Sequence, residues 1–349
     1  MTSHHTQLPP AQSNAPVFVV GSPRSGTTLL YHMLLSAGRF VRYRTETHVF
    51  NTLAPRFGGM RTAADRRGAL EMWLASDCHT LTGLSAAEVR DSIERECRGP
   101  GDFLRLVMEA MGRRQRLPRW AEATPAHVLH MREIRAQIPN ALFVQVVRDG
   151  RDVAASLTRQ GWIRPLARDS ERPALAAAAY WQWIMRRGRD EARGFGSNVY
   201  LEVRYEDLVD APVETLGRIG NFIGQSLDWE TIQRVGIGSV GKPNTSFPDA
   251  KSGGFKGRWR TELTVDDARL VDTMLSATLR DAGYDSDSGR RTVAQSAHYA
   301  MYACRFAVRD ALKRHTPLGR RLTDVSFFSH GSMRVTEEKL EQAAAADPP

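Results

Sequence analysis

A glycine loop near the N-terminus is the first feature with residue types suited to binding an anion. Gly21 and Gly26 bracket it, after a short apolar run and before a stretch with helical spacing. Such a loop aims backbone N–H groups and a helix N-terminus at a phosphate. The spacing is that of the nucleotide loop G-x-x-x-x-G-K-[ST], but Thr27 replaces the lysine and Arg24 supplies the cation. Thr28 stands where that loop would bind magnesium. The sequence therefore predicts an anion cradle and disfavours an ATPase or kinase.

A second cluster of charges follows another predicted strand. Arg148 comes directly after the apolar run 141–147, and Ser156 lies two turns into the next predicted helix. Ligands of α/β proteins bind at the carboxyl ends of the strands. With a tight turn, which Gly150 favours, Arg148 and Ser156 can converge on one phosphate. The alternative is a solvated, salt-bridged helix start made by Arg148, Asp149, Arg151 and Asp152.

Together, the loop Val17–Leu30 and the motif Val146–Ser156 resemble the donor-binding motifs of sulfotransferases that use 3′-phosphoadenosine-5′-phosphosulfate (PAPS). Two weaker blocks agree: Val203–Leu208 is similar to the family's Tyr-Glu-Asp-Leu element, and Lys251–Arg260 to its C-terminal nucleotide loop. The resemblance covers roughly residues 16–284. It implies that PAPS is bound by Arg24, Ser25, Gly26, Thr27, Thr28, Arg148, Ser156, Tyr205, Lys256, Gly257 and Arg258. It also implies a catalytic role for Arg24, which would stabilise the leaving phosphate.

The general base is expected in the segment Arg44–His48, which follows another predicted strand. This segment resembles the glutamate-containing segment of tyrosylprotein-type and many bacterial sulfotransferases, so Glu46 is the catalytic candidate. Glu46 could instead be a structural partner of a nearby arginine. His48 is the next candidate because imidazole exchanges protons near neutral pH, and His127 follows it. At position 123 the family often has lysine, whereas this chain has Ala123, which removes one possible charge stabiliser.

The elements that must position these residues alternate along the chain. Apolar runs predict strands at 17–20, 40–43, 141–147 and 199–203. Helical spacing predicts helices near 62–75, 85–97, 101–115, 126–137, 149–160 and 172–193. A further helix is expected after Thr264, a plausible N-cap. Strands separated by helices favour an α/β fold with a mainly parallel sheet covered on both faces. The resemblance makes this a three-layer fold of the P-loop type.

Composition limits the alternatives. The chain has 349 residues, of which 42% are hydrophobic and 25% charged, as in soluble globular proteins. The longest nearly apolar run, 174–185, is shorter than the roughly 20 residues a membrane span needs. Three cysteines in no metal-ligand spacing predict a reducing, cytoplasmic location and no metal site. The net charge of +9 favours an anionic partner. Nucleic acid is disfavoured because the aromatic cluster Tyr180–Trp183 lies in an alanine-rich helix typical of a core.

Three regions are expected: a flexible tail at 1–15, a sulfotransferase domain at 16–284 and a basic helical extension at 285–349. Residues 290–321 contain eight basic residues and one acidic residue. Arg305, Arg309 and Lys313 share one face of the predicted helix. A second, weakly apolar face is formed by Val293, Ala297, Ala300, Cys304 and Val308. This helix could dock on the main domain with its charges in solvent, or could contact an anionic membrane peripherally.

The expected reaction is in-line transfer of a sulfuryl group from PAPS to a hydroxyl acceptor, with Glu46 as base. A small molecule, a lipid or a glycan is expected as acceptor, ahead of protein tyrosine. Two other classes stay open: a P-loop kinase or NTPase, and a non-enzymatic binder of nucleic acid or membranes.

Overall fold

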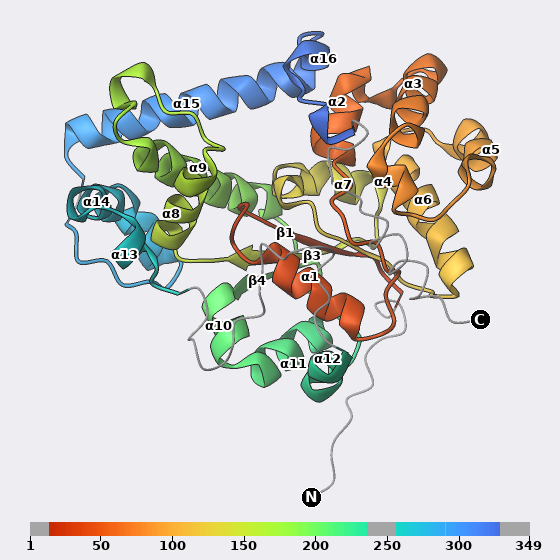
Figure 1. The fold of residues 1–349 in the computed structure, drawn as a ribbon, viewed down its shortest axis with the longest axis horizontal. Coiled ribbons are helices and arrows are strands. Elements are labelled where there is room, and N and C mark those ends of the chain that lie inside the picture. Colours follow the sequence, from red (N-terminus) through yellow and green to blue (C-terminus); the bar gives the residue numbers. More distant parts are fainter. Residues whose placement is uncertain (1–13, 236–255, 290, 329–349) are drawn as a thin grey trace, which may run out of the picture.

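A parallel four-stranded sheet lies at the centre of the computed structural model, which describes residues 14–235, 256–289 and 291–328 (Figure 1). The strands are β1 (Val17–Gly21), β2 (Ala121–Glu122), β3 (Leu142–Val147) and β4 (Tyr200–Arg204). Their order is β2–β1–β3–β4 and every pair is parallel. Parallel neighbours require crossover connections, which the helices supply. The predicted α/β class with a parallel sheet is therefore confirmed.

One predicted strand is wrong. Residues 40–43 form only an isolated bridge between Phe40 and Arg119, supported by a 2.7 Å bond from the Val41 N–H to the Arg119 carbonyl. The next N–H, that of Arg42, donates to the side chain of Gln115 at 2.8 Å. A side chain thus takes the place of the backbone partner, and the ladder ends after one bridge. The edge strand beside β1 is instead β2, which the sequence analysis did not assign.

Helices cover both faces of the sheet, giving three layers (Figure 1). The helices are α1 (Thr27–Ser36), α2 (Ala54–Arg56), α3 (Ala63–Leu74), α4 (Asp77–Thr80), α5 (Ala86–Glu96), α6 (Pro100–Gln115), α7 (Met131–Gln137), α8 (Gly150–Gln160), α9 (Pro173–Ala192), α10 (Tyr205–Asp210), α11 (Pro212–Ile223), α12 (Trp229–Val235), α13 (Trp259–Glu262), α14 (Val265–Asp281), α15 (Val293–His315) and α16 (Gly319–Leu322). Short 3₁₀ helices occur at Gly58–Met60, Pro125–His130, Ala167–Asp169 and Ser326–Phe328, and a π-helical turn at Val49–Leu53. Thr264 caps α14 as expected, accepting from the Asp267 N–H at 3.1 Å.

Strand β1 shows why the sheet is buried on both sides. Val17 and Val19 belong to a core shared with α1 and α11, whereas Phe18 and Val20 face the core that includes α6 and α9. Side chains alternate between faces with a period of two, so a strand that is apolar throughout needs helices on both sides. This arrangement leaves the carboxyl ends of the strands as the edge where loops gather.

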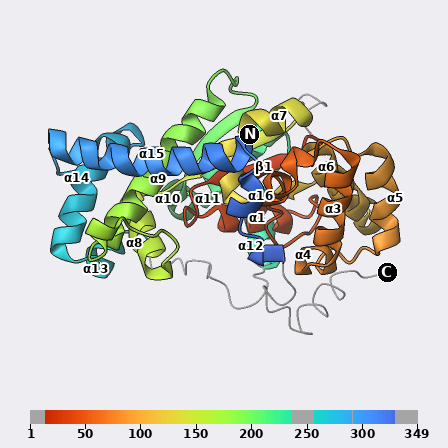
Figure 2. The ribbon, with the colours of Figure 1, turned by 90° about the horizontal axis from the view of Figure 1, so that it is seen from above.

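The basic C-terminal helix docks through aromatic residues. α15 lies across α9 and α14 (Figure 2), and the Phe306 ring sits 5.3 Å from Tyr180 and 5.7 Å from Trp183. Tyr302 is fully buried in the core that also holds Val147. The weakly apolar face predicted from sequence is exposed and does not dock, because the larger aromatic surface on the other side is the one buried. Within the described residues no helix is both long and apolar enough to cross a membrane.

The predicted tail falls almost wholly outside the described residues, which begin at residue 14. Ala15 is buried, and its carbonyl accepts a 2.7 Å bond from Arg119 Nε. Of the segment 251–260, which resembles the family's C-terminal nucleotide loop, only residues 256–260 are among the described residues. The division of the chain at residue 285 stays a prediction.

Candidate active site

The glycine loop between β1 and α1 is shaped by unusual backbone geometry and one close approach. Gly26 has φ +94°, and a Cβ at this position would lie 2.4 Å from Cδ2 of Tyr205. Only glycine meets both demands, since L side chains rarely adopt this φ and the Tyr205 ring leaves no room. Arg24 adopts φ +71° without being glycine. Such strain is retained where the surrounding structure fixes it, often at functional sites.

Arg24, Arg148 and Ser156 come together although they are far apart in sequence. Arg24 Nε donates to Ser156 Oγ at 3.0 Å, and Arg148 Nη1 donates to the Arg24 carbonyl at 3.1 Å. Burial, followed by the charges of Arg148 and Arg159, lowers the pKa of Arg24. A guanidinium stays protonated nonetheless, so these cations repel one another. An anion bound at this point would relieve the repulsion.

Tyr205 packs against this cation cluster. It follows β4 directly, is only 3% exposed, and its ring lies against Gly26. The Arg148 guanidinium carbon is 4.8 Å from the centre of the same ring, a distance typical of a cation–π contact. The Tyr205 ring therefore contacts both Gly26 and the Arg148 guanidinium and holds the two in a fixed relation.

The remaining loop residues fit an anion in different ways. Ser25 is fully buried, and its Oγ has no hydrogen-bond partner among the described residues. A buried hydroxyl without a partner is costly, so a ligand oxygen is the expected partner. Thr27 is buried and Thr28 exposed at the start of α1. The N–H groups of this first helical turn have no intrahelical acceptor and can bind a phosphate.

The charged motif after β3 divides into two parts. Arg151 pairs with Asp149 at 2.7 Å and with Asp272 at 2.8 Å, and its guanidinium lies 4.5 Å from the Trp259 ring. It is therefore a structural bridge between α8, α13 and α14. Arg151 is therefore salt-bridged, as in the alternative, but it is buried and not solvated. Arg148 turns toward the glycine loop and also lies 3.6 Å from Asp152.

Asp152 ties the turn before α13 to α8. Its carboxylate accepts the Gly257 N–H at 2.8 Å and the Trp259 N–H at 2.9 Å. Gly257 has φ +67°, which suits glycine at this turn. Burial raises the pKa of Asp152, and the nearby Arg148, at 3.6 Å, opposes that rise. Gly257 is therefore placed beside the Arg148 motif, and its role in binding PAPS stays a prediction.

The basic residues on either side of Gly257 point elsewhere in this structure. Lys256 pairs with Asp210 of α10, and Arg258 lies 3.9 Å from Glu262. Their predicted role in donor binding stays a prediction, since it requires these side chains to leave their present partners.

Glu46 lies in a short chain of polar side chains. Its Oε2 is 3.0 Å from Nε2 of His48, and Nδ1 of that imidazole is 3.1 Å from the Asn51 amide nitrogen. The amide donates to Nδ1, so Nε2 carries the proton and donates to Glu46. The Glu46 side chain is 39% exposed, against 17% for His48. Sequence reasoning missed Asn51, because a single asparagine in this segment carries no pattern that marks it as a partner of the His48 imidazole.

A buried network holds this segment against β2. Glu122 Oε1 accepts the Thr47 hydroxyl at 2.8 Å and also the Thr124 hydroxyl, while Oε2 accepts His127 Nδ1 at 2.9 Å. The Phe50 N–H donates to His127 Nε2 at 3.3 Å, so both imidazole nitrogens are engaged. Burial alone would raise the pKa of Glu122, but these donors hold it at about 2. His127 therefore positions the segment, and because it is fully buried it presents no surface to a substrate.

Two further observations concern the surroundings of Glu46. Tyr31 of α1 donates to the carbonyl of Tyr43, so the helix that follows the glycine loop also holds the strand-like run before Glu46. Ala123 is buried in the core on the α1 face of the sheet. No charge therefore stands at the place where the family often has lysine.

Comparisons with known proteins agree with this geometry. The model of the sulfotransferase family matches residues 16–230. Protein-tyrosine sulfotransferase A of Caenorhabditis elegans is 26% identical over 61% of this chain and 50% of the relative. Protein-tyrosine sulfotransferase 2 of Gallus gallus is 26% identical over 69% and 59%, so the chain spans only part of these relatives. The sulfotransferase domain of the Synechococcus PCC 7002 olefin synthase shares the fold, with a TM-score of 0.52 at 21% identity over 80% of this chain and 98% of that one. This chain belongs to the sulfotransferase family.

Proposed function

We propose that this protein is a PAPS-dependent sulfotransferase that acts on a hydroxyl acceptor. The observation that carries the proposal is the meeting of Arg24, Arg148 and Ser156 at the glycine loop, beside the unpartnered hydroxyl of Ser25. Two phosphate-bearing ends of one nucleotide would find cations and N–H donors there. The glycine loop suits the 5′ end, and Arg148 with Ser156 suits the 3′-phosphate.

On the donor side, the role of the protein is to position and neutralise charge. PAPS supplies an activated sulfuryl group whose sulfur–oxygen bond to the 5′-phosphate breaks as the acceptor oxygen attacks in line. Negative charge then grows on the leaving phosphate oxygen. Arg24 and the N–H groups at the start of α1 are placed to stabilise it, by analogy with phosphoryl transfer. Binding of the nucleotide would also satisfy the mutually repelling cations.

On the acceptor side, Glu46 takes the hydroxyl proton. Its carboxylate is half exposed, whereas both nitrogens of His48 already have partners in Glu46 and Asn51. The His48 N–H holds one carboxylate oxygen and leaves the other open to the acceptor. This favours Glu46 over His48 as general base, while His48 orients it. The proton ends on Glu46 and the sulfuryl group on the acceptor oxygen.

The acceptor class is a small-molecule, lipid or glycan hydroxyl, with protein tyrosine as the alternative. The relatives are named for protein tyrosine, but at 26% identity and partial coverage this does not carry over to the present chain. The test is a transfer assay with PAPS labelled in the sulfuryl group, offered a metabolite extract and a tyrosine-containing peptide pool. Acceptor-dependent release of adenosine 3′,5′-bisphosphate supports the proposal. Magnesium-dependent ATP turnover without such release would support the kinase class instead.

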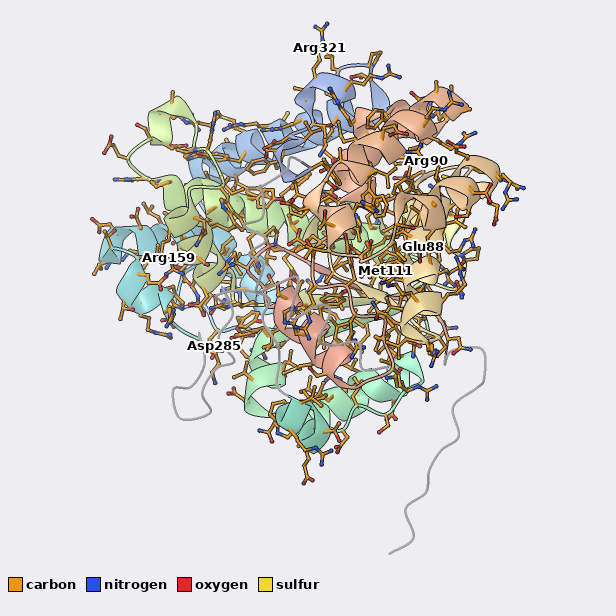
Figure 3. All side chains as sticks on the ribbon, turned by 45° about the vertical axis from the view of Figure 1, so that its right-hand side comes forward. Glu88, Arg90, Met111, Arg159, Asp285 and Arg321 are labelled. Carbon is orange, nitrogen blue, oxygen red and sulfur yellow. The ribbon has the colours of Figure 1, made fainter. Side chains whose placement is uncertain are left out.

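We also propose that the outer face of α15 contacts an anionic lipid surface. The exposed stripe consists of Val293, Ala297, Ala300, Met301, Cys304, Ala307, Val308 and Ala311. Arg305 and Arg309 lie beside it on α15, and Arg320 and Arg321 follow on α16, where Figure 3 shows Arg321 projecting outward. An apolar stripe flanked by arginines complements a surface with an apolar interior and anionic headgroups.

Vesicle co-sedimentation tests this contact. Each cation near an anionic surface contributes about 1 kcal/mol, so Arg305→Glu combined with Arg309→Glu should weaken binding to phosphatidylserine vesicles by at least about tenfold. Arg95→Glu on α5 is the matched control, since it removes an exposed arginine far from α15. Binding that is absent at low salt, or unaffected by the double substitution, contradicts the proposal. Concentration-dependent dimerisation would assign the stripe to a second copy instead.

A further inference from the structure

The chain after α15 returns to the segment that follows Glu46. Residues 316–328 are here named the C-terminal strap. They include α16, which packs on α2 (Figure 1). Arg320 Nη2 donates to Asp65 at 3.0 Å, and Arg56 of α2 donates to the Arg320 carbonyl. Gly319 is buried, and a Cβ there would lie 2.0 Å from the Lys313 carbonyl. These contacts fix the start of the strap on α2 and α3.

Its last described residues reach the candidate base. The ring centres of Phe327 and His48 are 4.0 Å apart with the planes at 62°, an edge-to-face contact. Phe328 is 5% exposed and belongs to the core that also contains Val49 and Phe50, the two residues after His48. Phe328 thus anchors the strap, and Phe327 places its ring on the imidazole.

His48 needs this support because its backbone is strained. It has φ +50° without being glycine. Its N–H donates to Thr124 Oγ1 at 3.3 Å, and its ring is bonded to Glu46 on one side and Asn51 on the other. These contacts engage the two ring nitrogens and would both break if the ring turned about its bond to Cβ. Phe327 packs against the imidazole and so opposes that rotation.

We propose that Phe327 is a positioning residue for the general base, acting through His48 on the Glu46 carboxylate. Phe327 lies outside residues 16–230, which the family model matches, so this chain adds a part of its own to the catalytic site. The inference rests on the proposed role of Glu46 as base. It implies that the C-terminal extension serves the reaction and does more than cover the core.

The test compares Phe327→Ala with Phe327→Tyr, which keeps the ring, and with Leu318→Ala. Leu318 is an apolar residue of the same strap that is 47% exposed and precedes Phe327 on the α16 side, so its variant controls for general loosening of the strap. Turnover should fall roughly 10- to 100-fold in Phe327→Ala, the cost of a small misplacement of a catalytic group. The KM for PAPS should stay unchanged, and Phe327→Tyr should recover most of the turnover.

A second readout does not depend on an acceptor. In full-length protein labelled with ¹⁵N-histidine and assigned with His48→Gln, the His48 ring should show one tautomer, protonated at Nε2. Phe327→Ala should give averaged tautomer signals, and Leu318→Ala should not. An unchanged tautomer, or a turnover loss equal to that of Leu318→Ala, overturns the proposal. If the wild-type protein transfers nothing from PAPS but Phe327→Ala still averages the His48 tautomers, the proposed function is contradicted and the contact between Phe327 and His48 is not.

Discussion

The donor half and the acceptor half of the site are built by different means. In the donor half, the glycine loop, Arg148 and Tyr205 each follow the last residue of a strand, and the parallel sheet brings these ends together. In the acceptor half, Glu46 lies outside regular structure. Side chains hold it: Thr124 accepts the N–H of Thr47, the next residue, Glu122 accepts the Thr47 hydroxyl, and His48 contacts Glu46 directly.

This difference matters because the two kinds of support respond differently to change. Backbone hydrogen bonds of a sheet persist whatever the side chains are, so the donor half is expected to tolerate substitution around it. A network of buried polar side chains is stable only when every member has its partner. The acceptor half should therefore be sensitive to single substitutions, including some at a distance from the reacting atoms.

The largest expected effect is in the acceptor half. Glu46→Gln keeps the shape of the side chain but cannot take the acceptor's proton, so turnover should fall by roughly 10²–10⁴. Affinity for PAPS, measured by calorimetry, should stay nearly unchanged. Acidic phenols need less help from a base and should recover part of the loss. If donor affinity falls in parallel, Glu46 is structural and His48 becomes the candidate base.

In the donor half, Arg24→Ala should lower turnover by about 10²–10³, the usual loss for one donor to a developing negative charge. Arg159→Ala is the matched control. It removes a neighbouring cation of α8 that pairs with Glu262 at 2.5 Å and lies outside the loop (Figure 3). Steady-state kinetics with saturating PAPS compares the two variants. Similar turnover in both would remove Arg24 from the mechanism.

Arg148→Ala separates the two ends of the nucleotide. A charge-assisted hydrogen bond contributes about 1.5–3 kcal/mol, so affinity for PAPS should fall by at least about tenfold. Adenosine 5′-phosphosulfate lacks the 3′-phosphate, and its affinity should change little. Calorimetric titration of both nucleotides provides the measurement. Equal weakening of the two would mean that Arg148 does not bind the 3′-phosphate.

The smallest effect concerns the support of the acceptor segment and its dependence on pH. The pKa of Glu122 is held at about 2, below the ordinary 4.5, so its stabilising effect is complete above about pH 4.5 and is lost as the pH falls toward 2. Glu122→Gln should lower the free energy of unfolding by roughly 1–3 kcal/mol at pH 7. Urea unfolding at pH 7 and pH 3.5 should show a smaller difference from wild type at the lower pH. A difference that grows on acidification would contradict the pairing.

The residues that local sequence patterns could predict lie mainly in the donor half of the site, and those they could not lie in the acceptor half. Gly26, Arg148 and Tyr205 were identified because their types and their places after apolar runs carry the chemistry locally. The predicted strand at 40–43 failed because the Gln115 side chain, 73 residues away, competes for the Arg42 N–H. Asn51 and Phe327 were missed because neither has a local pattern. Their roles depend on contacts with His48 that no spacing along the chain reveals.

By itself, the sequence determined the α/β order, the glycine loop between β1 and α1, and the family, because strand, turn and helix signals act over a few residues. Tertiary structure alone decided which charges face the glycine loop and which pair within the core. Arg148 and Arg151 stand three residues apart with the same chemistry, yet one lies on Tyr205 above the glycine loop and the other bridges Asp149 and Asp272. The reason is that a guanidinium binds whichever partner the packing of distant segments places within its reach.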